Sequence, residues 1–304
     1  MQQIDLRISI SSEDELTYHD PFGDGDHGQK LGVAFHETFA LSRPAISQIL
    51  KLAVEVAQDS PDGSCNLSND AIREGTSLGL NYVKAMGSYA RGCGLLGPNK
   101  HLTRLGQLVA ERDPGLSDLG TQWVMHYNMC APHLYGPDFW HPLLMAVISS
   151  GSGMSSEDVV EGLNGFVNER RARELAPRTV KATATVFLGT YTKPDGLGNL
   201  NAICEVEPAT YARGEPTMPR NWVAAYVIAD YWRANWRNAL GINLTSIKEI
   251  GGPASLLMLS SGEMNSCLGD LQSLGLVQLQ RRVPPFQVSR LWSSPEEILE
   301  HLYD

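Results

Sequence analysis

The stretch LSNDAIREGTSLGLNYVKAMGSYARGCGLLGPNKHLTRLGQLV, residues 67–109, decides how the rest of this sequence is interpreted. Ser68 is a residue type that caps helices, and it predicts a short helix directly after it. A turn near residues 76–79 then leads to a longer helix, because apolar residues recur at helical spacing at Tyr82, Val83, Met86, Tyr89 and Ala90. Gly92 or Gly94 is expected to end this helix. Residues 94–109 are then expected to form two strands joined by a tight turn.

This order of elements is typical of a winged-helix module, in which the second helix of a helix-turn-helix enters the major groove of DNA. An apolar helix from Arg43, opened by Pro44, precedes the stretch. The longer helix would present an outward face formed by Asn81, Lys84, Ser88 and Arg91. Because this face carries few charges, a winged helix used only for protein contacts is a nearly equal alternative.

The C-terminal residues repeat this pattern. TSIKEIGGPASLLML, residues 245–259, begins with a short helix, and SGEMNSCLGDLQSLGLV, residues 261–277, predicts a second one. VQLQRRVPPFQVSRLW, residues 277–292, predicts a wing hairpin with Pro284 and Pro285 at its tip, and a last helix follows from Ser294. The wing is basic through Arg281, Arg282 and Arg290, which are suited to contact backbone phosphates.

We therefore expect a mainly α protein with small β-hairpins, an α+β fold with winged-helix modules at both ends. The expected organisation is a loop and strand segment over residues 1–35, a winged-helix-like domain over 36–115, a helical middle domain over 116–232 and a C-terminal winged-helix domain over 233–304. The middle domain carries a basic cluster that is either a phosphate-contacting stripe or a solvated helix face, formed by Arg170, Arg171, Arg173, Arg178 and Lys181.

Composition limits what such modules can do. The chain has 304 residues and a formal net charge of −10, which argues against strong binding of nucleic acid by the chain alone. No apolar run is long enough to cross a bilayer and no secretory signal opens the sequence, so a cytoplasmic protein is expected. The five scattered cysteines contain no CxxC pair, which favours reduced and mostly buried thiols.

Residue types that carry chemistry are dense only near the N-terminus, at His19, Asp20, Asp24, Asp26, His27, His36 and Glu37. Carboxylates and imidazoles on one loop can bind a divalent metal such as Mg²⁺ or Mn²⁺ for phosphodiester cleavage. The predicted metal ligands are Asp24, Asp26, His27 and Glu37, and the predicted catalytic residues are His36, Glu37, Asp24 and Asp26. The alternative, which this segment alone favours, is a solvated acidic loop.

Other sites have weaker support. The sequence contains neither GxxxxGK[ST] nor GxSxG, so it offers no support for a P-loop ATPase or a hydrolase with a nucleophile elbow. His126, His133 and His141 lie among aromatic residues. An aromatic core or a partner-binding surface is the favoured interpretation of these three histidines.

Three segments resemble a family with the signature H-E-T-F, two residues, R, which is found in bacterial defence cassettes. They are FHETFALSR at 35–43, LGLNYVKAMGSYARGCGLL at 78–96 and KHLTRLGQLVAERDPGLSDLGTQWVMHY at 100–127. The best-understood members are the SspB-like components of the Ssp single-strand DNA phosphorothioation systems, which are similar to DNA nickases. The signature residues here are His36, Glu37, Thr38, Phe39 and Arg43.

The resemblance implies a role in replacing a non-bridging phosphate oxygen of DNA by sulfur, and so in defence against phage. It implies DNA and sulfur-transfer proteins as partners, namely a cysteine desulfurase, an ATPase and a PAPS-reductase-like ATP pyrophosphatase. A homodimer is compatible with this role, and no membrane partner is expected.

Three hypotheses follow. In the first, the chain is a metal-dependent nicking endonuclease in which Arg43 or the wing arginines steady the DNA backbone. In the second, it is a non-catalytic winged-helix adaptor that recruits the sulfur-transfer machinery. In the third, it is a transcription regulator, which the short and weakly basic recognition helices disfavour. Predicted DNA contacts are Arg43, Asn81, Lys84, Arg91, Arg281, Arg282 and Arg290.

Overall fold

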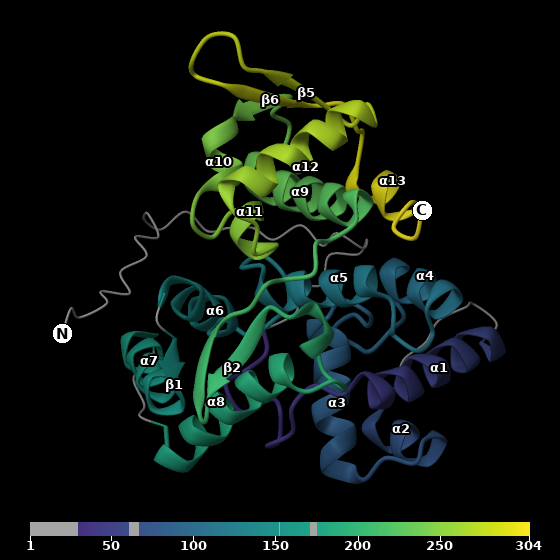
Figure 1. Cartoon of the computed structure of the whole chain (residues 1–304). Helices are drawn as coiled ribbons and strands as arrows, with labels where there is room; N and C mark the ends of the chain where they lie inside the picture. Colours follow the sequence, from purple (N-terminus) through teal and green to yellow (C-terminus); the bar gives the residue numbers. More distant parts are fainter. Residues whose placement is uncertain (1–29, 61–66, 152, 171–174) are drawn as a thin grey trace.

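The computed structural model describes residues 30–60, 67–151, 153–170 and 175–304. These residues form a larger, mostly helical body and a smaller C-terminal unit that lies on top of it in Figure 1. The body contains α1 (Arg43–Asp59), α2 (Asn69–Gly75), α3 (Leu80–Gly92), α4 (Arg104–Arg112), α5 (Leu119–Cys130), α6 (Trp140–Ser149), β1 (Met154–Ser155), α7 (Ser156–Arg170), α8 (Pro177–Thr192), the 3₁₀ turn η1 (Gly198–Leu200), β2 (Ile203–Glu207) and β3 (Thr210–Arg213). Mainly helical structure with small antiparallel sheets confirms the expected fold class at this level.

The first three helices form where the sequence predicts them. Pro44 stands in the first turn of α1, where its missing N–H has no helical partner to lose. Ser68 caps α2 by accepting a hydrogen bond of 3.0 Å from the Ala71 N–H. Helix α3 ends at Gly92, and Gly94 follows with a φ of 76°, a conformation that glycine adopts without strain.

The predicted hairpin over residues 94–109 is wrong in its second half. Between the described residues of this segment there is a single antiparallel bridge, Leu96 to Leu102, and the chain then enters α4. Thr103 is the reason, because its hydroxyl accepts from the Gly106 N–H at 2.9 Å and donates to the Gly94 carbonyl at 2.6 Å. A capped start followed by apolar residues at helical spacing favours a helix over a strand.

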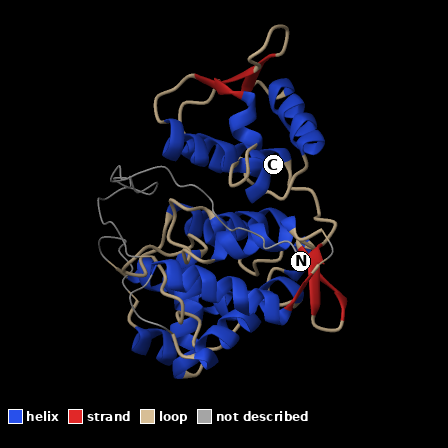
Figure 2. Cartoon of the chain, turned by 90° about the vertical axis from the view of Figure 1, so that its left-hand side faces the viewer, coloured by secondary structure: helices blue, strands red, loops and turns tan. Residues whose placement is uncertain are grey.

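The middle of the chain is helical as expected, but it also contains a small sheet. Strands pair in the order β1-β3-β2, all antiparallel, with Met154 opposite Tyr211 and Cys204 opposite Ala212. In Figure 2 this hairpin projects from the side of the helical body. This sheet is not predicted from the sequence, because residues 203–213 show only a short alternation between charged and apolar positions.

The C-terminal unit comprises α9 (Asn221–Trp236), β4 (Gly241–Asn243), α10 (Leu244–Lys248), α11 (Pro253–Leu256), α12 (Ser261–Ser273), β5 (Val277–Gln280), β6 (Gln287–Arg290) and α13 (Pro295–Leu299). The predicted hairpin is confirmed as β5 and β6, and β4 adds a third strand in the order β4-β6-β5. The boundary expected at residue 232 falls inside α9, which packs against α11, α12 and α13 on one side and α5 on the other.

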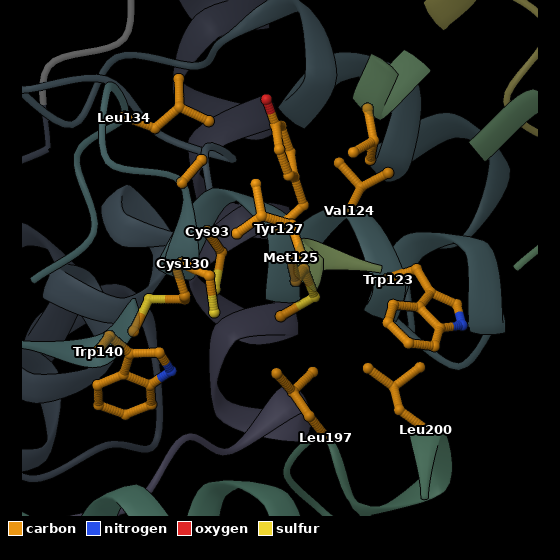
Figure 3. Packing of buried hydrophobic residues seen from close by; sticks show 14 of the residues in the cluster. Cys93, Trp123, Val124, Met125, Tyr127, Cys130, Leu134, Trp140, Leu197 and Leu200 are labelled. Atoms are coloured by element: carbon orange, nitrogen blue, oxygen red, sulfur yellow. The ribbon is translucent and has the colours of Figure 1, made fainter. Parts of the chain in front are cut away.

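The core is centred on α5, whose residues from Gly120 to Cys130 are all buried. In Figure 3, Trp123 of this helix lies near Leu200, while the ring of Tyr127 points to the opposite side of the core. Several polar side chains in this core are hydrogen-bonded across elements. The His126 Nε2–H donates to the Leu256 carbonyl at 2.8 Å, so its Nδ1 accepts from the Tyr191 hydroxyl at 2.9 Å. The hydrogen bond from His126 to Leu256 ties the C-terminal unit to the body.

Two further expectations concern cysteines and membranes. Cys93, Cys130 and Cys267 are free and buried and Cys204 is free and partly buried, which confirms the expected reduced thiols, while Cys65 lies outside the described residues. Within the described ranges, no helix combines the length and apolar character that crossing a membrane requires.

Arg43, a predicted DNA contact, has a mostly enclosed side chain. The residue is 9% exposed, and its guanidinium donates to the Gly196, Leu116 and Pro194 carbonyls at 2.6, 2.8 and 2.5 Å. Each of its three nitrogens already donates to a carbonyl, which gives Arg43 a structural role. Arg43 joins the start of α1 to the loops that follow α4 and α8.

Replacing Arg43 by Met should therefore lower the free energy of unfolding by roughly 3 kcal/mol, because three buried carbonyls lose their donor. Urea denaturation followed by circular dichroism measures this change. The same replacement at Arg73, an exposed residue of α2, serves as the control and should change stability by less than about 0.5 kcal/mol. Equal effects at the two positions would contradict the structural role of Arg43.

Candidate nucleic-acid interface

Only one of the predicted metal ligands, Glu37, lies among the described residues. Asp24, Asp26 and His27 lie outside the described residues, and Glu37 is exposed on a loop before α1. In the described part of the chain, no group of three His, Cys, Asp or Glu side chains comes together as metal ligands do. The metal-binding role of the N-terminal segment therefore stays a prediction.

His36 has the environment of a structural histidine, not of the predicted catalytic base. It is 2% exposed, its Nδ1 accepts from the Thr38 N–H at 3.0 Å, and its Nε2 therefore carries the proton and donates to Thr183 Oγ1 at 2.9 Å. Burial lowers its pKa to about 4, against a weaker opposing effect of a hydrogen bond with the Val33 backbone. With both nitrogens engaged, His36 holds the signature loop onto α8.

The predicted DNA face of α3 is only partly available. Asn81 and Lys84 are exposed, but Arg91 is half-buried and its guanidinium lies 5.8 Å from the ring centre of the buried Tyr135. A cation over an aromatic face is held there electrostatically. The exposed surface of α3 therefore offers Asn81 and Lys84, and its capacity for DNA contact remains a prediction for those two residues.

The C-terminal hairpin separates the three predicted wing arginines. Arg281 and Arg282 are exposed in the loop between β5 and β6. Arg290 instead donates to the carbonyls of Ala239, Trp292 and Ser293 at 3.1–3.2 Å. Its guanidinium therefore fixes the base of the hairpin and is not suited to contact a phosphate.

A basic group forms where α10, α12 and the hairpin loop meet. Lys248 Nζ donates to Asn265 Oδ1 at 2.6 Å, and Arg281 Nη2 lies 3.4 Å from the Asn265 carbonyl oxygen. Burial first, and then the positive charge of Arg281, lower the pKa of Lys248. Among the described residues, neither these two nor Arg282 forms an ion pair.

Like charges held together without a carboxylate partner favour an anion beside them. We call Lys248, Arg281 and Arg282 the wing-base cluster. The neighbouring surface of α12 is different, because it exposes Glu263 and Asp270 and no lysine or arginine. In this part of the C-terminal unit, the positive charge therefore lies beside α12 and not on its surface.

Sequence reasoning identified Arg281 and Arg282 but missed Lys248 and Asn265. Lys248 is the last residue of the short helix α10, and the spacing of that helix gave no reason to place it beside a hairpin more than thirty residues later. The other predicted basic cluster is described only in part. Arg178 and Lys181 are exposed on α8, while Arg171 and Arg173 lie outside the described residues, so the stripe remains a prediction.

These features define a mostly helical protein with a basic edge on a small sheet-containing unit. Residues 33–303 match the model of the family described as "Protein of unknown function (DUF4007)", and the chain belongs to that family. No curated protein matches the sequence.

Two solved structures share the fold. One is described as "SspB crystal structure", with a TM-score of 0.71 at 17% identity, and the other as "Magnesium ion-bound SspB crystal structure", with a TM-score of 0.69 at 18% identity. Each alignment covers 91% of this chain and 88% of the other. The chain is thus similar to SspB over nearly its whole length, which agrees with the family resemblance in its sequence.

The buried histidines give the protein a defined response to acid. The pKa values of His36, His126 and His141 are lowered from 6.5 to about 4, in each case mainly by burial. The unfolded chain binds protons at these sites first as the pH falls below 6.5. Their contribution to stability is therefore complete above pH 6.5 and is lost progressively down to about pH 4.

Replacing His36 by Gln should make the free energy of unfolding fall less steeply between pH 6.5 and pH 4.5, while lowering stability at pH 7 by roughly 1–2 kcal/mol through the altered hydrogen bonds. Urea unfolding at the two pH values measures both effects. His101→Gln is the matched control for the loss of an imidazole elsewhere in the chain. A wild-type slope in the His36 variant would show that the imidazole is not held neutral.

Proposed function

We propose that this protein is a DNA-engaging component of a DNA phosphorothioation system of the kind in which SspB-like proteins act. The observation that carries the proposal is the wing-base cluster, in which Lys248 and Arg281 meet at Asn265 and Arg282 follows in the sequence, and none of the three has an ion-pair partner among the described residues. Similarity in fold to SspB over 91% of the chain and the H-E-T-F resemblance support the choice of system.

We further propose that the C-terminal unit is a winged helix. Its order of α9, β4, α10 with α11, α12, β5 and β6, and its sheet order β4-β6-β5, support this assignment. In that interpretation α12 would be the recognition helix. Its exposed acidic residues Glu263 and Asp270 disfavour insertion among phosphates, so DNA would be held from the side by Lys248, Arg281 and Arg282.

Contacts of this kind position DNA without reading its sequence, because they engage the phosphate backbone. They fit a subunit that presents DNA to partners, since a net charge of −10 limits what the chain retains alone. The proposed partners are the cysteine desulfurase, the ATPase and the PAPS-reductase-like ATP pyrophosphatase of such systems.

A second candidate function is nicking of the DNA backbone. The specific observation in its favour is that a magnesium-bound SspB structure shares the fold. The proposed ligands are Asp24, Asp26, His27 and Glu37, of which only Glu37 can be examined. Its exposed carboxylate is compatible with binding a metal, although among the described residues it belongs to no group of three His, Cys, Asp or Glu side chains placed as metal ligands. A divalent ion held there would supply Lewis-acid chemistry.

Alanine at Lys248 or at Arg281 should each weaken binding of a short DNA duplex about fivefold at low salt, because each removes one phosphate contact. The slope of the logarithm of affinity on the logarithm of salt should fall by about one per variant. Fluorescence anisotropy over a salt series measures both. Lys51→Ala, on the exposed face of α1, is the matched control. Equal affinities in all variants would contradict the proposed interface.

Supercoiled plasmid distinguishes the nicking role from the adaptor role. We expect relaxed circles to accumulate with Mg²⁺ or Mn²⁺, to disappear on chelation, and to fall at least tenfold in an Asp24→Asn, Asp26→Asn double variant. Glu37→Gln tests the described ligand separately. Absence of nicking by the wild-type protein, together with co-purification of a sulfur-transfer partner, would support the adaptor role instead.

A further inference from the structure

The junction between α5 and α9 contains a buried polar network that the proposed DNA contacts do not use. Asp230 of α9 is 1% exposed and accepts three hydrogen bonds. Its Oδ2 accepts from the Tyr127 hydroxyl at 2.6 Å and from His133 Nε2 at 2.8 Å, and its Oδ1 accepts from Arg233 Nη2 at 2.8 Å. Three converging donors fix the carboxylate in one orientation.

The charges of this network keep Asp230 ionised. Burial alone would raise the pKa of Asp230, but the hydrogen bond and charge of His133 and the charge of Arg233 outweigh it and set the pKa at about 2. Arg233 also pairs with Glu296, so two carboxylates face one guanidinium.

His133 differs from the buried histidines in having one nitrogen available. Its Nε2 carries the proton donated to Asp230, so its Nδ1 bears a lone pair. Among the described residues Nδ1 has no hydrogen-bond partner, and the side chain is 19% exposed. His36 and His126, by contrast, have both ring nitrogens bonded. An imidazole oriented by a buried carboxylate, with its other nitrogen open, is the arrangement of a general base.

His133 stands in the loop between α5 and α6, beside Lys30 and Leu31. The Leu31 N–H donates to the Tyr135 carbonyl of this loop at 3.4 Å, and Lys30 pairs with Asp138 at 2.7 Å. Tyr231 of α9 lies on the other side of the imidazole, edge-on at 5.9 Å.

We propose that His133 is the proton-transfer residue of phosphodiester hydrolysis by this protein, with Asp230 as its positioning residue. The inference rests on the nicking role proposed above. In the step, a water oxygen bonds to phosphorus while the bond from phosphorus to the O3′ leaving oxygen breaks. His133 Nδ1 accepts the water proton and later releases it to solvent, while the leaving O3′ oxygen, on the opposite side of the phosphorus, takes a proton from a second water, so atoms and charge balance. Asp230 stabilises the imidazolium formed in between.

The test is plasmid nicking by His133→Ala with and without added imidazole. General acid–base catalysis is worth about 10²–10⁴ in rate, so the variant should nick at least about 100-fold more slowly. Added imidazole should restore part of the rate, because it can occupy the vacated space and accept the proton. DNA affinity should stay unchanged, since the wing-base cluster is intact. His101→Ala with and without imidazole is the matched control and should keep the wild-type rate.

Asp230→Asn provides a second variant of the same volume. It should reduce the nicking rate at least tenfold without being rescued by imidazole, because the His133 ring is present but no longer oriented. Thermal unfolding of both variants shows whether they fold at the assay temperature.

The outcomes separate the two proposals. A slow His133→Ala variant that imidazole does not rescue assigns the network a structural role and overturns this inference, as does a wild-type rate in that variant. In both cases the nicking role stands. Absence of nicking by the wild-type protein overturns both the nicking role and this inference, while DNA binding through the wing-base cluster remains independently testable.

Discussion

The burial of α5 is the constraint on which the rest of the structure depends. Every residue from Gly120 to Cys130 is buried, and five of the side chains in that range carry polar atoms in addition to the two aromatic rings of Trp123 and Tyr127. An unpaired polar group in such a core is expensive, so partners must be supplied by neighbouring elements. Trp123 Nε1 donates to the Thr217 carbonyl, and His126 donates to the Leu256 carbonyl. These two bonds hold both the segment after β3 and the C-terminal unit against α5.

This constraint separates the histidines into two chemical classes. His126 lies inside α5 and must be neutral, because its Nδ1 has to accept from Tyr191 while its Nε2 donates to Leu256. His133 follows the end of α5, where the chain turns toward the surface, and only one of its nitrogens is used by the core. The chain therefore has a structural imidazole at His126, inside α5, and an imidazole with an open nitrogen at His133, shortly after the end of α5.

The positively charged side chains also fall into two classes, according to whether they lie against the core. The arginines that lie against the core, Arg43 and Arg290, donate to backbone carbonyls and stabilise loop junctions. Arg281 and Lys248 lie at an edge where hydrogen bonds reach only one amide residue, and their charge remains available to an anion. A chain of net charge −10 can in this way offer a small cationic surface. Such a surface suits a subunit that holds DNA together with partners.

The sequence alone determined the local structure where a capping residue and an apolar period agreed, as at Ser68 for α2, in the continuous apolar pattern of α9, and in the hairpin around Pro284 and Pro285. It also indicated the resemblance that the family model and the shared fold with SspB later bore out. The wrong prediction of a second strand at Thr103 has a local cause, because the capping hydroxyl of Thr103 outweighs a short apolar run. Tertiary structure alone decided which polar residues face solvent. Arg43 and Arg281 are the same amino acid, yet Arg43 is enclosed and Arg281 is exposed. His36 and His133 are both histidines, yet His36 has both ring nitrogens bonded while His133 has one. These differences come from contacts between residues far apart in the sequence. Their roles depend on such long-range contacts, and no pattern of neighbouring residues records them.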